Sequence, residues 1–245
     1  MTSRKRKRGS AAFDAVGDLL RRVAARAAER AGGCSGLLRP LRAALDLADA
    51  PQRVAARRYR TSSSAELGVR VERELALTIA GGALPPKAHR MTRALHAFLR
   101  KRRWTLLATQ VPLHDAAVPL HTRADFLARD ERSGALVLIE LKTGYDAGYA
   151  STLTPPAGVD VPAIERLFKR RDSHAARHQL QLAWMDWQLR RAYAVPRAAL
   201  VSVVLRVTNR RRAEVRAPDP LAPWAERAAD TLVARLREHL RAPQF

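Results

Sequence analysis

Hydrophobic residues recur with helical spacing in three long stretches of the chain. Apolar side chains at every fourth position predict a helix over residues 65–80, which follows the candidate N-cap residues Thr61–Ser64. A basic amphipathic helix is expected over 91–102, with Leu95, Phe98 and Leu99 facing inward. The stretch 174–193 is apolar on almost every side between Leu180 and Trp187, which indicates a largely buried helix.

Shorter stretches alternate with period two or form brief β-branched runs, and these patterns predict strands. The expected strands cover residues 104–112, 118–128, 135–142, 198–207 and 213–216. The first two should form an antiparallel pair joined near His114 and Asp115. Residues 145–161 contain Gly and Pro without periodicity, and we interpret them as a loop over the site described below.

The order helix, strand, strand, strand, helix, strand predicts an α/β fold with a central mixed sheet. We expect a core domain over 61–217, preceded by a basic helical extension over 1–60. The extension would carry helices near 13–30 and 37–47, and an amphipathic C-terminal helix within 218–245 would pack on the core.

Polar groups gather at the end of the third predicted strand. Period-two geometry places Glu140 and Lys142 on one face of that strand and Leu141 on the other. A carboxylate and an ammonium at the end of a buried strand are costly unless they are paired or used. Asp125 on the neighbouring strand supplies a second carboxylate. Two carboxylates and a lysine suit a hard divalent cation and a water to be activated.

Asp125, a spacer of fourteen residues and then Glu140-x-Lys142 resemble the PD-(D/E)xK nuclease superfamily, in particular its RecB-type and lambda-exonuclease-type branch. The resemblance spans about residues 65–207 and implies a restriction-endonuclease-like core. It places Asp125 on the second strand and the ExK motif on the third. It also implies that Asp125, Glu140 and the Leu141 backbone carbonyl hold Mg²⁺ or Mn²⁺, while Lys142 positions a water.

Two further segments take part in this resemblance. Gly68 and Glu72 stand where RecB-type nucleases have a glycine and, four residues on, a histidine or an acidic residue. Glu72 would therefore complete the metal site directly or through water. Gln181 resembles the glutamine of the QxxxY motif and would orient Lys142 or a phosphate, although Met185 stands where tyrosine is usual. Whether Gln179 or Gln181 faces the site stays open.

The same residues also allow interpretations without a role in catalysis. The helix 65–80 carries further glutamates, and we expect Glu66 and Glu74 to be solvated surface residues. His174 and His178 have the spacing of a helical zinc pair, but Ala175 stands where HExxH has its glutamate. We interpret the two histidines as surface residues near phosphate.

The charge balance points to a polyanionic partner. Lys and Arg total 45 against 23 Asp and Glu, a formal net charge of +22, which favours nucleic acid or an anionic membrane surface. No apolar run is long enough to span a bilayer, so the sequence predicts a soluble protein. DNA contacts are expected from a basic cluster behind the loop and from the following helix, at Lys169, Arg170, Arg171 and Arg177.

The N-terminal run Arg4–Arg8 resembles a nuclear localisation signal and predicts a nuclear protein, in the host nucleus if the protein is viral. The alternatives for this run are a phosphate-binding arm or a solvated tail, with a cytoplasmic location. A lone cysteine, Cys34, excludes an internal disulfide and any multi-cysteine metal site.

The sequence as a whole predicts a Mg²⁺-dependent deoxyribonuclease that hydrolyses phosphodiester bonds. The resemblance implies exonuclease-like work in DNA recombination, repair or replication, with endonuclease activity left open. A homo-oligomer and a recombination or replication protein as partner are both compatible with it. The alternative is a catalytically inactive, nuclease-like basic protein that binds or packages DNA.

Overall fold

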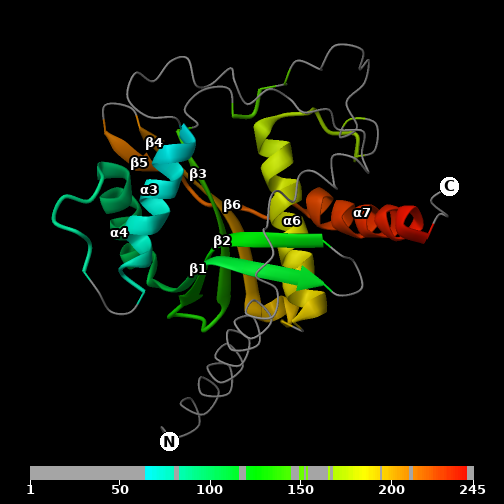
Figure 1. Cartoon of the computed structure of the whole chain (residues 1–245), viewed down its shortest axis with the longest axis horizontal. Helices are drawn as coiled ribbons and strands as arrows, with labels where there is room; N and C mark the ends of the chain where they lie inside the picture. Colours follow the sequence, from blue (N-terminus) through cyan, green and yellow to red (C-terminus); the bar gives the residue numbers. More distant parts are fainter. Residues whose placement is uncertain are drawn as a thin grey trace, which may run out of the picture.

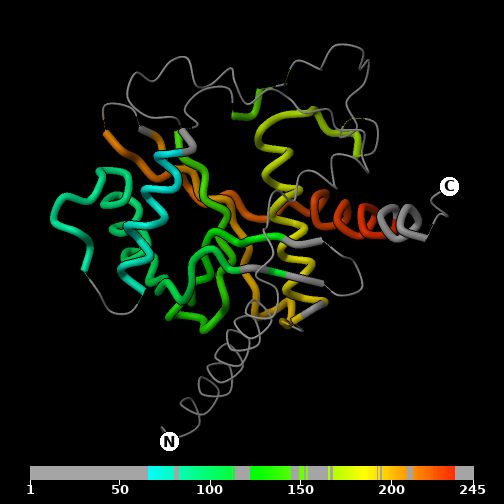
Figure 2. The backbone as a smooth tube through the Cα atoms, viewed as in Figure 1, coloured from blue at the N-terminus to red at the C-terminus, as the bar shows by residue number. Residues whose placement is uncertain are grey.

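The computed structural model describes residues 64–79, 83–115, 120–144, 149–151, 153, 165, 168–193, 195–209 and 212–241, and Figure 2 traces the chain through them. The basic run Arg4–Arg8 and the helices predicted near 13–30 and 37–47 lie outside these residues. Most of the predicted loop over 145–161 lies outside them as well.

Helices and strands follow one another in the predicted order. The elements are α3 (Ser64–Ala76), α4 (Arg90–Arg102), β1 (Trp104–Asp115), β2 (Leu120–Asp130), β3 (Leu136–Thr143), α6 (His174–Ala192), the short 3₁₀ helix η3 (Arg197–Ala199), β4 (Leu200–Asn209), β5 (Ala213–Val215), β6 (Asp219–Pro220) and α7 (Pro223–Arg241). Among these helices, none is long and apolar enough to cross a membrane.

The strands form one mixed sheet in the order β1-β2-β3-β4-β5, with β6 also paired to β4. Strands β1, β2 and β3 pair antiparallel. Strands β3 and β4 are parallel, and α6 lies between them in the chain, because a parallel pair requires a crossover connection. The predicted α/β fold with a central mixed sheet is confirmed.

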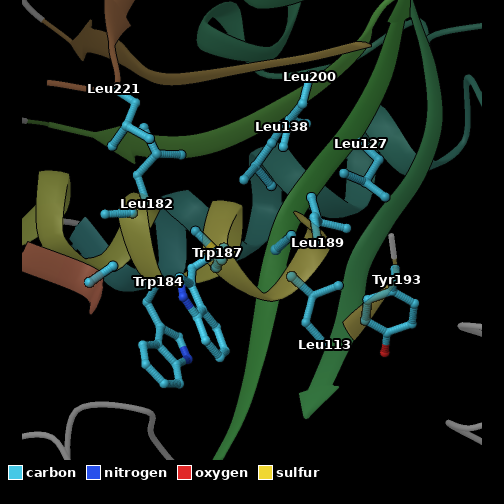
Figure 3. Packing of buried hydrophobic residues seen from close by; sticks show 14 of the residues in the cluster. Leu113, Leu127, Leu138, Leu182, Trp184, Trp187, Leu189, Tyr193, Leu200 and Leu221 are labelled. Carbon is cyan, nitrogen blue, oxygen red and sulfur yellow. The ribbon is translucent and has the colours of Figure 1, made fainter. Parts of the chain in front are cut away.

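Helices cover both faces of the sheet, as Figure 1 shows with α3 and α4 on one side and α6 and α7 on the other. Alternate residues of β3 pack against the helices on opposite faces of the sheet. Leu136 and Leu138 pack in a cluster with α6 and α7, where Trp184 and Trp187 stack with ring centroids 5.5 Å apart (Figure 3). Val137, Ile139 and Leu141 pack in a second cluster with α3 and α4. A strand buried on both faces explains the continuous apolar run in the sequence.

Two expectations about local structure are wrong. His114 and Asp115 do not join the first strands, because they belong to β1 and pair with His121 and Leu120. Glu74 is not a solvated residue, since only 8% of its surface is exposed. Its carboxylate accepts hydrogen bonds from the Arg70 guanidinium, the His89 backbone N–H and the Thr92 hydroxyl, at 2.8, 2.8 and 2.5 Å. Glu74 therefore fastens α3 to the start of α4.

Candidate active site

The middle of β2 and the end of β3 bring Asp125, Glu140 and Lys142 together. Phe126 pairs with Ile139 in the antiparallel register, so the next position along places Asp125 beside Glu140. The Asp125 carboxylate accepts the backbone N–H of Leu141 at 2.7 Å, which holds its side chain against β3. Lys142 donates to Oε1 of Glu140 and forms an ion pair with it. The predicted proximity of these three side chains is therefore a feature of the sheet.

Glu140 lies in an environment that disfavours its charged form. Its residue is 0% exposed, and its second carboxylate oxygen, Oε2, is buried without a hydrogen-bond partner. Burial raises the pKa of Glu140 to about 8, and the Lys142 ammonium opposes this rise while the negative charge of Asp125 adds to it. Burial likewise raises the pKa of Asp125, against the effect of Lys142. A fixed cation at this position would relieve both costs.

Glu72 reaches the same group from α3 through a residue that the sequence did not reveal, Gln110 of β1. The Gln110 amide nitrogen lies 2.6 Å from Oε2 of Glu72 and 3.5 Å from Oδ1 of Asp125. Its amide oxygen accepts from the Arg123 guanidinium at 3.4 Å. Gln110 has a φ of 50°, an uncommon value for a residue other than glycine, and this backbone conformation aims the amide between the two carboxylates.

The charge of Glu72 is also perturbed by its surroundings. Burial raises its pKa to about 7, and repulsion from Asp125 adds to the rise, while Lys142, Arg123 and the Gln110 hydrogen bond lower it. One turn earlier, Gly68 approaches Thr143 of β3, where an added Cβ would lie 3.4 Å from the hydroxyl oxygen. This is an ordinary contact distance, so packing against β3 does not by itself require glycine.

The oxygen ligands of this cluster fit a hard divalent cation. Within the described residues, no group of three His, Cys, Asp or Glu side chains is placed to hold a metal ion. Magnesium, however, is usually bound by one or two carboxylates and keeps several waters or substrate oxygens. Asp125 and Glu140 offer such a pair, and the unpartnered Oε2 of Glu140 is an unused ligand atom. The Glu72 carboxylate is separated from Asp125 by the Gln110 amide, which lies between them.

The two glutamines of α6 have different environments. Gln179 is buried, its amide nitrogen donates to the Pro220 carbonyl at 3.1 Å, and its amide oxygen accepts the Ala222 backbone N–H at 2.9 Å. It therefore ties α6 to the segment that precedes α7. Gln181 is half-buried, and among the described residues it makes no hydrogen bond to Lys142. The structure thus gives Gln179 a structural role and leaves the role of Gln181 a prediction.

The residues predicted to contact DNA fall into two groups. Lys169, Arg170 and Arg171 are exposed, and the Arg170 guanidinium lies 5.7 Å from the centroid of the Trp224 ring. Arg177 instead forms a two-point ion pair with the buried carboxylate of Asp172, with distances of 2.8 and 2.6 Å. An arginine engaged in this way has fewer donors left for phosphate.

The interpretation of both histidines of α6 as surface residues is wrong for His178. Its ring is buried, and its Nδ1 lies 3.3 Å from the hydroxyl of Tyr149. Burial lowers the pKa of His178 to about 2, and the nearby Lys142 ammonium adds to this effect. His178 is therefore a neutral group beside the lysine. His174, one turn earlier, is half-buried.

No protein-family model matches the sequence, and no curated protein matches it. A crystal structure from Eubacterium rectale described as a "putative exonuclease" aligns over 74% of this chain and 70% of that chain, with 11% sequence identity and a TM-score of 0.41. The crystal structure of SSO0001 aligns over 84% of this chain and 87% of that chain, with 15% identity and a TM-score of 0.27. With both TM-scores below 0.5, neither likeness assigns a family or a function to this chain.

Proposed function

We propose that this chain is a Mg²⁺- or Mn²⁺-dependent deoxyribonuclease of the PD-(D/E)xK type, which hydrolyses phosphodiester bonds. The observation that carries the proposal is the cluster of Asp125, Glu140 and Lys142, in which burial raises the pKa of both carboxylates and leaves one Glu140 oxygen without a partner. Buried, mutually repelling carboxylates beside a lysine are costly for stability and are typical of functional sites.

Each residue of the cluster has a chemical task in this proposal. Asp125 and Glu140 would hold the cation, together with the Leu141 carbonyl, and Glu72 would contribute directly or through a water. The bound cation supplies charge neutralisation at the scissile phosphate and lowers the pKa of a water. Lys142 orients that water and stabilises the negative charge that develops on the phosphate oxygens. Gln181, on the same helix as His178, would steady Lys142 or a phosphate.

The partner in this proposal is DNA, and the formal charge of +22 supports it. The exposed Lys169, Arg170 and Arg171 offer phosphate contacts near the N-terminus of α6. We propose an activity on DNA ends, as the resemblance to exonucleases of recombination and repair implies. Linear DNA labelled at one end should then be degraded while covalently closed circular DNA survives.

The decisive experiment is cleavage of linear DNA by the purified chain and by Lys142→Ala. Wild type should cleave with Mg²⁺ or Mn²⁺ and fail with Ca²⁺, whose longer bonds hold substrate without aligning the water. Lys142→Ala should abolish cleavage but keep DNA affinity nearly unchanged, because one ammonium adds little to a distributed electrostatic surface. The exposed Lys101 on α4 gives a matched control, since Lys101→Ala should cleave normally.

Two results would overturn the proposal. Full cleavage in the presence of a chelator would remove the metal from the mechanism. DNA binding without cleavage in any divalent cation would favour the alternative, a catalytically inactive protein that binds or packages DNA.

A further inference from the structure

Arg206 occupies the position beside Lys142 on the neighbouring strand. Strands β3 and β4 are parallel, and their register pairs Lys142 with Arg206. Leu138 lies four positions before Lys142 and Val204 lies two positions before Arg206, and both pack in the same core cluster. An even offset keeps a side chain on the same face of its strand, so the faces of both strands agree. Lys142 and Arg206 therefore project from the same face of the sheet, the face that α6 covers.

An aromatic ring fixes the orientation of the Arg206 guanidinium. Its central carbon lies 4.3 Å from the centroid of the Tyr149 ring. Tyr149 in turn is buried and contacts His178, with ring centroids 5.5 Å apart. Stacking uses the flat face of a guanidinium and leaves its N–H groups, which lie in the plane, free to bind an acceptor.

Arg206 also differs from the other partly buried arginines on this side of the sheet. Arg177 pairs with Asp172, and Arg190 pairs with Asp186, at 2.6 Å in both cases. Among the residues that the structure describes, no carboxylate pairs with Arg206, and its Nε is buried without a hydrogen-bond partner. A buried donor on a permanently charged group is costly unless an acceptor completes it.

Two cations side by side repel each other, and this cost is offset only when an anion lies between them. The charge of Lys142 is already balanced by Glu140, whereas that of Arg206 is not balanced by any described carboxylate. The two non-bridging oxygens of a phosphodiester can accept two N–H groups of one guanidinium, and the proposed substrate contains such phosphates.

We propose that Arg206 is a phosphate-binding residue of the candidate active site. Its guanidinium, stacked on the Tyr149 ring, would donate hydrogen bonds to two oxygens of a DNA backbone phosphate next to Lys142. This inference rests on the proposed function only in taking DNA as the substrate. It adds a residue from β4, an element to which no site residue was assigned by the sequence.

The test compares Arg206→Gln with Arg191→Gln. Arg191 is a matched control because it is exposed and lies at the C-terminal end of α6. Affinity for a short duplex would be measured by fluorescence anisotropy in EDTA at several salt concentrations. Arg206→Gln should bind about tenfold more weakly at low salt, as expected for a lost charge-assisted hydrogen bond. It should also lower the slope of log K against log[salt] by about 0.9, the loss of one phosphate contact.

Arg206→Lys separates a phosphate contact from a purely structural cation. It keeps the charge and the aliphatic stem but loses the two-point geometry, so affinity should fall several-fold while the salt slope stays at the wild-type value. Tyr149→Leu should weaken binding in the same way, and Tyr149→Phe should keep it. Melting curves would show which variants are folded. If Arg206→Gln does not fold, unchanged affinity in Arg206→Lys overturns the inference.

The result also separates this inference from the proposed function. If wild type cleaves no DNA with any cation, the nuclease proposal fails, while the anisotropy measurement still reports on Arg206. If wild type cleaves but folded Arg206→Gln binds and cleaves as well as Arg191→Gln does, the nuclease proposal stands and Arg206 is not a phosphate ligand.

Discussion

Glu72 and Glu74 lie two residues apart on α3 and have opposite environments. For Glu74, burial alone would raise the pKa, but hydrogen bonds from Thr92, Arg70 and the His89 backbone outweigh it, and the pKa is lowered. For Glu72, burial and the nearby Asp125 raise the pKa to about 7, and the charges of Lys142 and Arg123 and the hydrogen bond from Gln110 oppose this rise only in part. Hydrogen bonds therefore stabilise the charged form of Glu74, whereas the charged form of Glu72 is not fully compensated.

The same contrast appears on the other layer of the molecule. Asp186 on α6 is fully buried, and its carboxylate accepts from Ser202 and Arg190, both at 2.6 Å, and from Arg197 at 3.4 Å. Glu140 is equally buried but keeps one oxygen without a partner. Burial alone therefore does not distinguish a structural carboxylate from a candidate ligand. The number of donors aimed at each oxygen does.

The largest effect should come from Glu140→Gln, which keeps the shape of the side chain but removes its charge. We expect cleavage to fall by about 10²–10³-fold, the range for loss of one group that stabilises transition-state charge. The metal-free melting temperature should not fall, since an incompletely paired buried anion is removed. Single-turnover cleavage rates and melting curves in EDTA would measure this. Unaltered cleavage would show that Glu140, like Asp186, has only a structural role.

Glu74→Gln should show the reverse pattern. The amide can keep some contacts, but its N–H groups face the Arg70 and Thr92 donors, so we expect a loss of about 1.5–3 kcal/mol in the free energy of unfolding. Urea denaturation would measure the loss, with Glu72→Gln as the matched control on the same helix. Cleavage per folded molecule should be retained in Glu74→Gln. A stable Glu74→Gln would contradict the role of Glu74 in joining α3 to α4.

The pH dependence of stability offers a third test. Because the pKa values of Glu72 and Glu140 are raised in the folded chain, the native state binds more protons than the unfolded state between about pH 5 and 8. Their contribution to stability is thus present at low pH and is lost as the pH rises through about 7 and 8. In EDTA, the difference in stability between Glu72→Gln and wild type should increase across this window, and likewise for Glu140→Gln.

A bound cation should reverse this trend. Metal ligands must be deprotonated, so binding of Mn²⁺ should release protons and should stabilise the wild type more at pH 8 than at pH 6. Calorimetric titrations in buffers of different ionisation enthalpy would count the protons. If Mn²⁺ stabilises the protein equally at both pH values, the carboxylates with raised pKa values are not the metal ligands.

The smallest effect should follow from Gln110→Ala. The Gln110 amide lies between Glu72 and Asp125 and donates to both, so its loss increases the repulsion between the two carboxylates. The metal-free melting temperature should fall slightly, and Mn²⁺ affinity should rise several-fold because no amide has to be displaced. Thermal shifts at increasing Mn²⁺ concentration would measure this, with the exposed Lys101→Ala as the control variant. An unchanged affinity would show that Gln110 does not hold the place of a ligand.

Some of these features could be predicted from the sequence and others could not. The short apolar run 135–139, with the β-branched Val137 and Ile139, predicted a buried strand, and period two placed Glu140 and Lys142 on one face. By contrast, Glu72 and Glu74 both flank the apolar row of α3, and helical periodicity cannot tell which one meets the sheet. Gln179 and Gln181 were ambiguous for the same reason. The donors that decide these cases come from residues 15 to 43 positions away.

Local pattern by itself determined the order of helices and strands and the placement of Glu140 and Lys142 on one face at the end of β3, because side-chain direction within an element follows from backbone geometry alone. Only the tertiary structure decided which further groups join them. Gln110 reaches the site through an unusual backbone conformation, and Arg206 reaches it through the parallel register of β3 with β4. Both depend on contacts between distant segments, which the packing of the whole core sets and no local pattern records.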